Sequence, residues 1–186
     1  GIKDAVVNVH HLAPKLRQHL GARTTRPHVM ISDEIDCLMD TGGAVAKALP
    51  LIASNEFVVA ASDVIRRGDG LEALFAAWDA NRMDILMLLH PRETANGFDG
   101  AGDFFINASG QPTRRGDAAL APFVYAGLFV CHRRVYADVP VGPFSNNLVW
   151  DRVNAAGKLF ALVHEGDWFH VGTPAAITLA NDAFGD

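Results

Sequence analysis

The stretch Phe57-Val58-Val59-Ala60-Ala61-Ser62-Asp63 decides how the rest of this chain is interpreted. Its first five residues are apolar and mostly favour β-structure, a pattern typical of a strand buried on both faces of a parallel sheet. The run then ends in Ser62 and Asp63. Because ligands in open α/β sheets bind beyond the carboxyl ends of strands, Asp63 is placed to hold a hard cation against a phosphate. Asp is also a favoured turn and cap residue, so a turn-capping role for Asp63 is the alternative.

Composition limits the possible functions. The chain has 186 residues, enough for one domain with a substantial core, and its net charge of −5 argues against a dedicated nucleic-acid binder. No apolar run approaches the ~20 residues that a membrane span needs. Cys37 and Cys131 lie in apolar runs without metal-ligand spacing, which predicts buried thiols in a reducing cytoplasm. The basic pairs are interpreted as solvated loops that can also steer an anionic small molecule. These pairs are Arg66-Arg67, Arg114-Arg115 and Arg133-Arg134.

Apolar runs and amphipathic stretches alternate along the chain. The predicted strands cover residues 5–9, 27–32, 57–61, 84–90, 103–107, 123–131, 159–164 and 168–172, with a short extended segment at 35–38. The predicted helices cover residues 12–20, 44–49 and 71–81, a helix capped by Ser145 and ended by Gly157, and a last helix opened by Thr173-Pro174. This alternation indicates an α/β fold with a largely parallel sheet.

Two glycine-containing stretches point to close approach of a ligand. Asp40-Thr41-Gly42-Gly43 forms a polar turn that opens a helix, where unpaired backbone N–H groups and the helix dipole favour an anion. A plain capped turn explains the same residues equally simply. Gly127 stands in the middle of the long apolar run 123–131, and an interior strand glycine often marks the approach of a ligand or another backbone.

Five stretches in a fixed order resemble the sugar-phosphate nucleotidyltransferases, also called nucleotide-sugar pyrophosphorylases. No single motif is specific, but the ordered set is, and the resemblance runs from the first residue to about Asn181. The sequence is similar above all to the short bacterial branch that contains mannose-1-phosphate guanylyltransferase-like and N-acetylmuramate-1-phosphate uridylyltransferase-like enzymes. The five stretches are Asp40-Thr41-Gly42-Gly43, Ser62-Asp63-Val64, Gly102-Asp103-Phe104, Tyr125-Ala126-Gly127 and Trp168-Phe169-His170-Val171-Gly172-Thr173-Pro174.

The resemblance implies a fold and a reaction. The fold is α/β, with a Rossmann-like, mostly parallel sheet flanked by helices and a sugar-binding, β-rich part in the C-terminal half. Residues 1–186 then form a single domain, with a nucleotide-binding part at 1–90 and a sugar-binding part at 91–186. The reaction converts an NTP (UTP or GTP) and a sugar 1-phosphate into an NDP-sugar and pyrophosphate, with Mg²⁺ as the cofactor. Such an enzyme works in the cytoplasm on cell-wall precursors.

The resemblance also implies roles for individual residues. Asp63 matches the family's first metal-binding aspartate and is expected to be catalytic. His170 stands where many members have the second metal-binding aspartate. Expected nucleotide-binding residues are Thr41, Gly42, Gly43 and Ser62. Expected sugar-binding residues are Gly102, Asp103, Tyr125, Gly127 and Trp168.

His170 departs from the family pattern. Imidazole is a poorer magnesium ligand than a carboxylate and suits softer ions better. Three interpretations follow: His170 binds a softer or weakly held ion, it contacts phosphate directly, or the site has lost its second anchor. A retained functional role, catalytic and metal-binding, is the interpretation adopted for His170.

A second departure concerns the beginning of the family pattern. The glycine-rich phosphate loop with its Arg and the later Pro-Lys-Pro segment would lie before Gly1, so this sequence is expected to be the C-terminal portion of a longer enzyme. If the loop is truly missing, the alternative is a non-catalytic relative that binds a nucleotide-sugar. Neither the base, the sugar nor the oligomeric state follows from these residues.

Overall fold

The computed structural model describes residues 1–185. By its internal contacts the chain forms two compact units, each described here on its own. The first unit comprises residues 1–57 and 133–152, and the second comprises residues 58–132 and 153 onward. Strands and helices alternate in both units, so the α/β class is confirmed. The functional division predicted at residues 90 and 91 stays a prediction.

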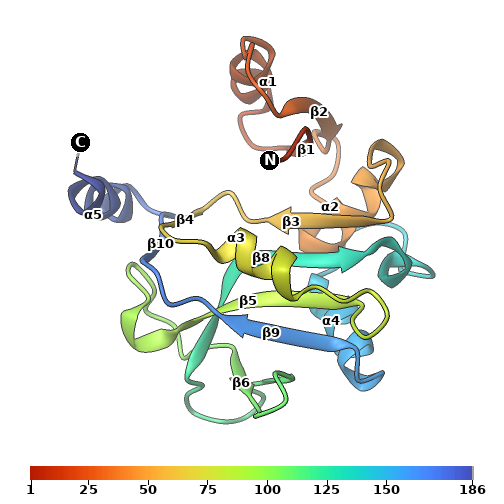
Figure 1. Cartoon of the computed structure of the whole chain (residues 1–186). Helices are drawn as coiled ribbons and strands as arrows, with labels where there is room; N and C mark the ends of the chain where they lie inside the picture. The colour runs from red at the N-terminus through yellow and green to blue at the C-terminus, as the bar shows by residue number, and fades with distance from the viewer. Residues whose placement is uncertain (186) are drawn as a thin grey trace. The chain divides into compact units, whose positions relative to one another are not determined.

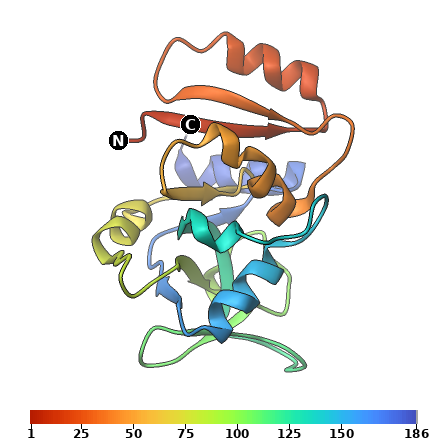
Figure 2. The ribbon, with the colours of Figure 1, turned by 90° about the vertical axis from the view of Figure 1, so that its right-hand side faces the viewer.

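The first unit is built around two parallel strands. β1 (Asp4–Val9) pairs with β2 (His28–Asp33), and the crossover between them is α1 (Ala13–Gly21). Figure 2 shows the two strands side by side with α1 beyond them. A helix is the usual way to join parallel neighbours. The remaining helical elements of this unit are α2 (Asp40–Ala48), η1 (Leu49–Leu51) and η3 (Arg133–Tyr136).

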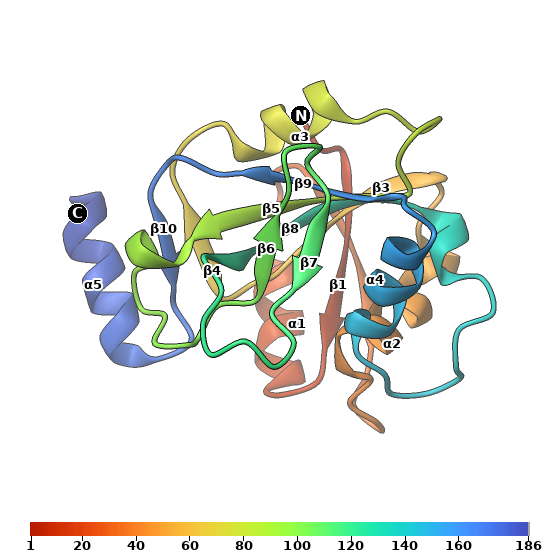
Figure 3. The same cartoon turned by 90° about the horizontal axis from the view of Figure 1, so that it is seen from below.

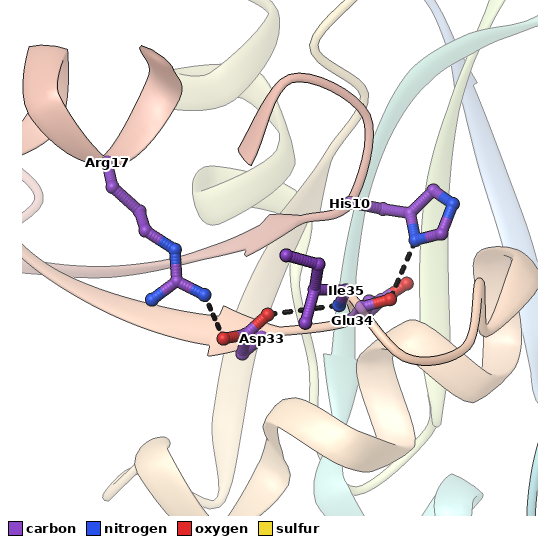
Figure 4. Close-up of polar contacts among 5 residues, drawn as sticks. All are labelled: His10, Arg17, Asp33, Glu34 and Ile35. Atoms are coloured by element: carbon purple, nitrogen blue, oxygen red, sulfur yellow. Dashed lines mark hydrogen bonds and ion pairs between the residues drawn. The ribbon is translucent and has the colours of Figure 1, made fainter. Parts of the chain in front are cut away.

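The segment after β2 does not follow its prediction. The carboxylate of Asp33 accepts a hydrogen bond from the Ile35 backbone N–H at 3.0 Å, an Asx-type turn that ends the strand (Figure 4). Residues 35–38 therefore form no strand, and the predicted extended segment there is wrong. The Cys37 thiol is exposed rather than buried, because this turn leaves its apolar neighbours in solvent. The burial of Cys131 is confirmed.

The second unit contains the larger sheet. Figures 1 and 3 show its strands, with β5 (Ile85–Pro91) between β8 (Phe123–His132) and β9 (Leu159–Val163). The hairpin of β6 (Phe104–Ile106) and β7 (Pro112–Arg114) extends the sheet beyond β8, and β6 lies within the strand predicted at residues 103–107. α3 (Gly70–Ala77) packs against β5 and β8. The buried core of this unit consists of Leu74, Met83, Leu86, Leu88, Val124, Ala126, Leu128, Val130 and Trp168.

Strand directions in this sheet are mixed rather than mostly parallel. β5 is parallel to β9 but antiparallel to β8, and β6 is antiparallel to both β7 and β8. A continuous apolar run predicts burial of a strand on both faces, but it does not predict whether the neighbouring strand is parallel or antiparallel. β3 (Glu56–Ala60) pairs only with β8 among the described strands and is half-buried, so its predicted burial on both faces is wrong.

A two-stranded ladder lies beside the larger sheet in the same unit. β4 (Val64–Arg66), which was predicted as loop, pairs antiparallel with β10 (Trp168–His170). α5 (Pro174–Phe184) follows β10, and the Thr173 hydroxyl accepts the Ala176 N–H at 3.2 Å, so the predicted cap is confirmed.

Two helical elements complete the described chain. The Ser145 hydroxyl likewise caps α4 (Asn146–Ala155), as predicted. η2 (Arg92–Thr94) is a single turn after β5. Within residues 1–185 every helix is too short or too polar to cross a bilayer.

Candidate functional site

A carboxylate and an imidazole meet at one end of the β4–β10 ladder. The His170 Nε2 atom lies 3.4 Å from Asp63 Oδ2, and the two side chains are 38% and 54% exposed, respectively. No backbone N–H donates to the Asp63 carboxylate among residues 1–185, so the carboxylate does not act as the turn cap that the sequence left open. Both groups are accessible to a ligand from solvent.

Backbone hydrogen bonds fix the distance between these two side chains. The Val171 N–H donates to the Asp63 carbonyl at 2.7 Å, and the His170 N–H donates to the Asn96 carbonyl at 2.9 Å. Ladder pairing sets His170 opposite Val64, the residue that follows Asp63. The pair is therefore positioned by main-chain contacts that do not depend on either side chain.

The spacing of the pair fits a divalent cation. Two neighbouring ligands of an octahedral ion at about 2.1 Å lie about 3 Å from one another. Among residues 1–185 no third His, Cys, Asp or Glu joins Asp63 and His170, so other ligands would come from water or from substrate phosphates. One oxygen and one nitrogen donor suit an ion that accepts both, such as Mn²⁺ or Co²⁺, better than Mg²⁺.

Gly127 forms a bulge in β8 directly beneath this ladder. The pairing moves from Met87 opposite Phe129 to Leu89 opposite Tyr125, so β8 has two more residues than β5 over this interval. Gly127 has φ +75°, and a Cβ there would press on Val64 and Ala61. The sequence prediction that another backbone approaches this glycine is thus confirmed, because the Ala61 N–H donates to the Gly127 carbonyl at 2.8 Å.

The predicted sugar-facing residues 102, 103 and 125 are joined by hydrogen bonds and turn geometry. The Asp103 carboxylate accepts the Tyr125 N–H at 2.8 Å. Burial raises the pKa of the Tyr125 hydroxyl, which therefore stays protonated. Gly102 adopts φ +82° with its Cα against the Ala121 carbonyl, leaving no room for a side chain.

Trp168 is buried, at 2% exposure. Its ring lies between those of His90 and His170, with centroids 5.6 Å and 6.4 Å away and nearly parallel planes. The indole N–H donates to the Ala126 carbonyl at 3.1 Å. In this conformation Trp168 supports the bulge and the His170 ring from below, and its predicted contact with sugar stays a prediction.

Arg66 is a residue whose environment the sequence interpretation missed. It was expected in a solvated loop, but it lies in β4, is half-buried, and its Nη1 donates to the Ala126 carbonyl at 2.9 Å. The only available signal was its membership of the Arg66-Arg67 pair. Such a pair does not say which arginine points inward, and only the ladder with β10 determines that.

In the first unit, the glycine turn at the start of α2 differs from its prediction. The Thr41 N–H donates to Asp40 Oδ1 at 2.5 Å, and the Gly42 and Gly43 N–H groups donate to the Phe144 carbonyl at 2.8 Å and 3.0 Å. These N–H groups are paired within the protein, so the anion site predicted from unpaired N–H groups is wrong. A nucleotide contact of this turn by other atoms remains a prediction.

Two buried polar residues that sequence reasoning missed hold this turn. Asn146, at 4% exposure, donates its backbone N–H to Thr41 Oγ1 at 3.0 Å and its Nδ2 to the Thr41 carbonyl at 3.2 Å. Glu34, also buried, accepts hydrogen bonds from Asn8 Nδ2 and from the Met39 N–H. Thr41, the partner of Asn146, lies 105 residues away, and Asn8, a partner of Glu34, lies 26 residues away, so no local pattern signals these two contacts.

The second unit thus brings together most of the predicted site. Asp63 and His170 form a pair, while Trp168 and Gly127 lie beneath them around the Ala126 carbonyl. The Tyr125 N–H donates to the carboxylate of Asp103, which follows Gly102 in the chain. Ser62 precedes Asp63 in the exposed turn after β3. The predicted residues Thr41, Gly42 and Gly43 belong to the first unit.

A curated relative covers almost the whole chain. No protein-family model matches the sequence. The N-acetylmuramate alpha-1-phosphate uridylyltransferase of Caulobacter vibrioides is 38% identical in an alignment of 181 residues that covers 94% of this chain and 75% of the relative. The chain therefore spans about three quarters of the length of that protein.

Solved structures share the fold at low sequence identity. HddC from Yersinia pseudotuberculosis has a TM-score of 0.75 and 17% identity, covering 99% of this chain and 80% of HddC. The same protein complexed with GMP-PN gives a TM-score of 0.72, 16% identity, and coverage of 96% and 77%. The inositol-1-phosphate CTP transferase from T. maritima gives a TM-score of 0.66, 15% identity, and coverage of 95% and 73%. These likenesses support the fold.

Proposed function

This chain belongs to the sugar-phosphate nucleotidyltransferase family, and from that premise we propose that it transfers a uridylyl group from UTP to an N-acetylmuramate-type sugar 1-phosphate. The products are the UDP-sugar and pyrophosphate. A phosphate oxygen of the sugar 1-phosphate attacks the α-phosphorus of UTP. The bond from that phosphorus to the oxygen bridging the β-phosphorus breaks, and pyrophosphate leaves with the electron pair.

The observation that carries the proposal is the 38% identity to a uridylyltransferase across 94% of this chain. The match extends over nearly the whole chain rather than over a single motif. The accessible Asp63–His170 pair adds a chemical reason, since phosphoryl transfer needs charge neutralised close to the phosphates.

Asp63 and His170 are assigned to the divalent cation. A bound cation supplies neutralisation and alignment of the phosphates for in-line attack. Asp63 offers a carboxylate oxygen and His170 its Nε2 atom, and backbone hydrogen bonds at Val171 and Asn96 hold the two residues in place. This pair of donors suits Mn²⁺ or Co²⁺ better than Mg²⁺.

The sugar is assigned to the segments around the β8 bulge. Tyr125 keeps a protonated hydroxyl there, while Asp103 orients the Tyr125 backbone. Gly127 lets the segment before β4 pack closely against the bulge, because a side chain there would meet Val64 and Ala61. With an N-acetylmuramate-type substrate the product is a precursor of the cell wall, and the proposed location is the cytoplasm.

The direct test is a product assay with the intact protein. UTP, GTP, CTP and dTTP are each incubated with N-acetylmuramate 1-phosphate, N-acetylglucosamine 1-phosphate or mannose 1-phosphate, with Mg²⁺ or Mn²⁺. The ³¹P NMR spectrum reports pyrophosphate and the NDP-sugar diphosphate in one measurement. We expect UTP with N-acetylmuramate 1-phosphate to react fastest.

The outcomes separate the possible functions. Preference for GTP and mannose 1-phosphate would keep the reaction class but overturn the substrate. Binding of a UDP-sugar by calorimetry without turnover of any pair would contradict the enzymatic proposal and favour a nucleotide-sugar-binding relative.

A further inference from the structure

Arg66 carries a positive charge toward the β8 bulge. It ends β4, where ladder pairing sets it opposite Trp168. Because strand side chains alternate between faces, Arg66 points to the same side as Val64, whose side chain contacts Gly127. Its Nη1 donates to the Ala126 carbonyl at 2.9 Å, the same oxygen that accepts the Trp168 indole N–H. The guanidinium therefore lies at the bulge.

No carboxylate among residues 1–185 neutralises this guanidinium. The Asp63 carboxylate pairs with His170, and the Asp167 carboxylate lies 3.7 Å from Arg67. A guanidinium has five N–H donors, and the one hydrogen bond to Ala126 leaves the others for solvent or a ligand. A half-buried charge without a partner is costly, and burial lowers the pKa of Arg66 without discharging it.

The groups around Arg66 do not neutralise its charge. Tyr125 is close enough for its hydroxyl to interact electrostatically with both Arg66 and Asp63. That hydroxyl is neutral, so it does not supply the missing anion. The surroundings thus combine one uncompensated cation and a neutral hydroxyl, in the same unit as the pair assigned to the phosphates.

We propose that Arg66 binds an anionic group of the sugar substrate through its forked guanidinium N–H groups. Two groups have this chemistry: a carboxylate carried on the sugar ring and the 1-phosphate itself. Both accept a bidentate guanidinium. The inference rests on the proposed sugar-phosphate function and adds to it a preference for acidic sugars, if the carboxylate is the group bound.

The test compares an acidic and a neutral sugar that differ by one carboxylate. N-acetylmuramate 1-phosphate carries a lactyl carboxylate, and N-acetylglucosamine 1-phosphate lacks it. Steady-state kinetics and calorimetric binding are measured with both sugars for wild type, Arg66→Gln and Arg66→Lys. We expect Arg66→Gln to raise the KM and Kd of the acidic sugar about 10- to 100-fold, the usual size for a lost charged hydrogen bond.

The result with the neutral sugar shows which anionic group Arg66 binds. If only the acidic sugar weakens, the carboxylate is bound by Arg66; if both weaken equally, the 1-phosphate is. Unchanged values for both sugars would overturn the inference. Arg66→Lys keeps the charge but loses the fork, so it should lie between wild type and Arg66→Gln, and it decides the matter should Arg66→Gln fail to fold.

Arg67→Gln is the matched control. Arg67 lies next in sequence but is exposed, with its guanidinium over the Phe184 ring at 4.4 Å and beside Asp167. It should leave both sugars unaffected, and an equal effect of Arg67→Gln would overturn a specific role of Arg66. A wild type that turns over neither sugar refutes the proposed function and this inference with it. A wild type active alongside a normal Arg66→Gln variant refutes the inference alone.

Discussion

The turn at the start of α2 and the ladder end at Asp63 are both predicted from the sequence to meet a ligand, but they differ in how their polar groups are used. The Gly42 and Gly43 N–H groups donate to the Phe144 carbonyl, and Asn146 binds Thr41 twice, so the protein itself satisfies this turn. At the ladder, among residues 1–185, the polar side-chain atoms of Asp63 and His170 pair with one another and are otherwise open to solvent. A polar group that is fully paired stabilises a fold, whereas one left accessible is available for chemistry.

This difference predicts opposite consequences for substitutions. Changes in the glycine turn should reduce the free energy of unfolding, and changes at the ladder end should reduce turnover while the fold persists.

The largest expected effect is on turnover in Asp63→Asn. Removing the carboxylate charge while keeping its shape should lower kcat about 10²- to 10³-fold, the size typical of a lost electrostatic contact in a transition state. Because Asp63 is 54% exposed, the melting temperature should hardly change. The control is Asp117→Asn, an exposed loop carboxylate in the same unit. Full activity of Asp63→Asn would remove Asp63 from the site.

Gly42→Ala should have the next largest effect, on stability. A Cβ at position 42 would press on the Phe144 ring and on the Asn146 backbone, an overpacking that costs about 1–3 kcal/mol. Gly21→Ala is the matched control, since a Cβ there meets nothing within 4 Å. Urea unfolding measures both variants. Equal midpoints would mean that the turn is less rigid than its hydrogen bonds indicate.

His170→Asp should change metal preference more modestly. Two carboxylates at this spacing suit Mg²⁺, so we expect the ratio of Mn²⁺ to Mg²⁺ affinity to fall about 10-fold. Electron paramagnetic resonance of Mn²⁺, with Mg²⁺ as competitor, reports affinity independently of turnover. His11→Asp, at an exposed position of the first unit, controls for added negative charge. An unchanged ratio would indicate that His170 does not bind the ion.

The smallest effect is a loss of stability in mild acid through His90. Burial is the main cause that lowers the pKa of His90, with a smaller contribution from His164, while hydrogen bonds with Thr94 and His164 oppose the shift. The unfolded chain therefore binds a proton more readily than the folded one. Stability is complete above the unfolded pKa near about 6.5 and falls as the pH drops below it.

Trp168 fluorescence can follow this transition, because its ring stacks on His90. Urea midpoints at pH 7.5 and 5.5 should differ less in His90→Gln than in wild type. The same pH dependence in both proteins would assign the acid sensitivity to groups other than His90.

Local patterns predicted much of the fold because burial leaves a continuous record in the sequence. β5 and β8 were found from unbroken apolar runs, and α4 and α5 from their caps at Ser145 and Thr173. Strand direction was not predictable, since β8 is buried whether its neighbour is parallel or antiparallel. β4 was missed because it has only three residues and ends at the first residue of an arginine pair, which is too little signal to predict a strand.

In the candidate site, too, local features could be predicted from the sequence and long-range contacts could not. Asp63 and Gly127 could be singled out as candidates because a strand end and an interior glycine are local features. The partners that determine what each group can do are distant: Phe144 for the glycine turn, Ala126 for Arg66 and Asp167 for Arg67. These pairings arise only when the chain is folded, so no spacing rule reveals which cation is left without an anion.

The ladder between β4 and β10 also has an evolutionary consequence. Main-chain pairing holds its strands in register, and that pairing is independent of the side chain at position 66. Natural variation or protein engineering can therefore exchange Arg66 for a neutral or acidic residue while the backbone beneath the bulge is inherited unchanged. Position 66 is then a place where descendants of this protein diversify in the charge of the sugars they accept, without first having to find a new fold.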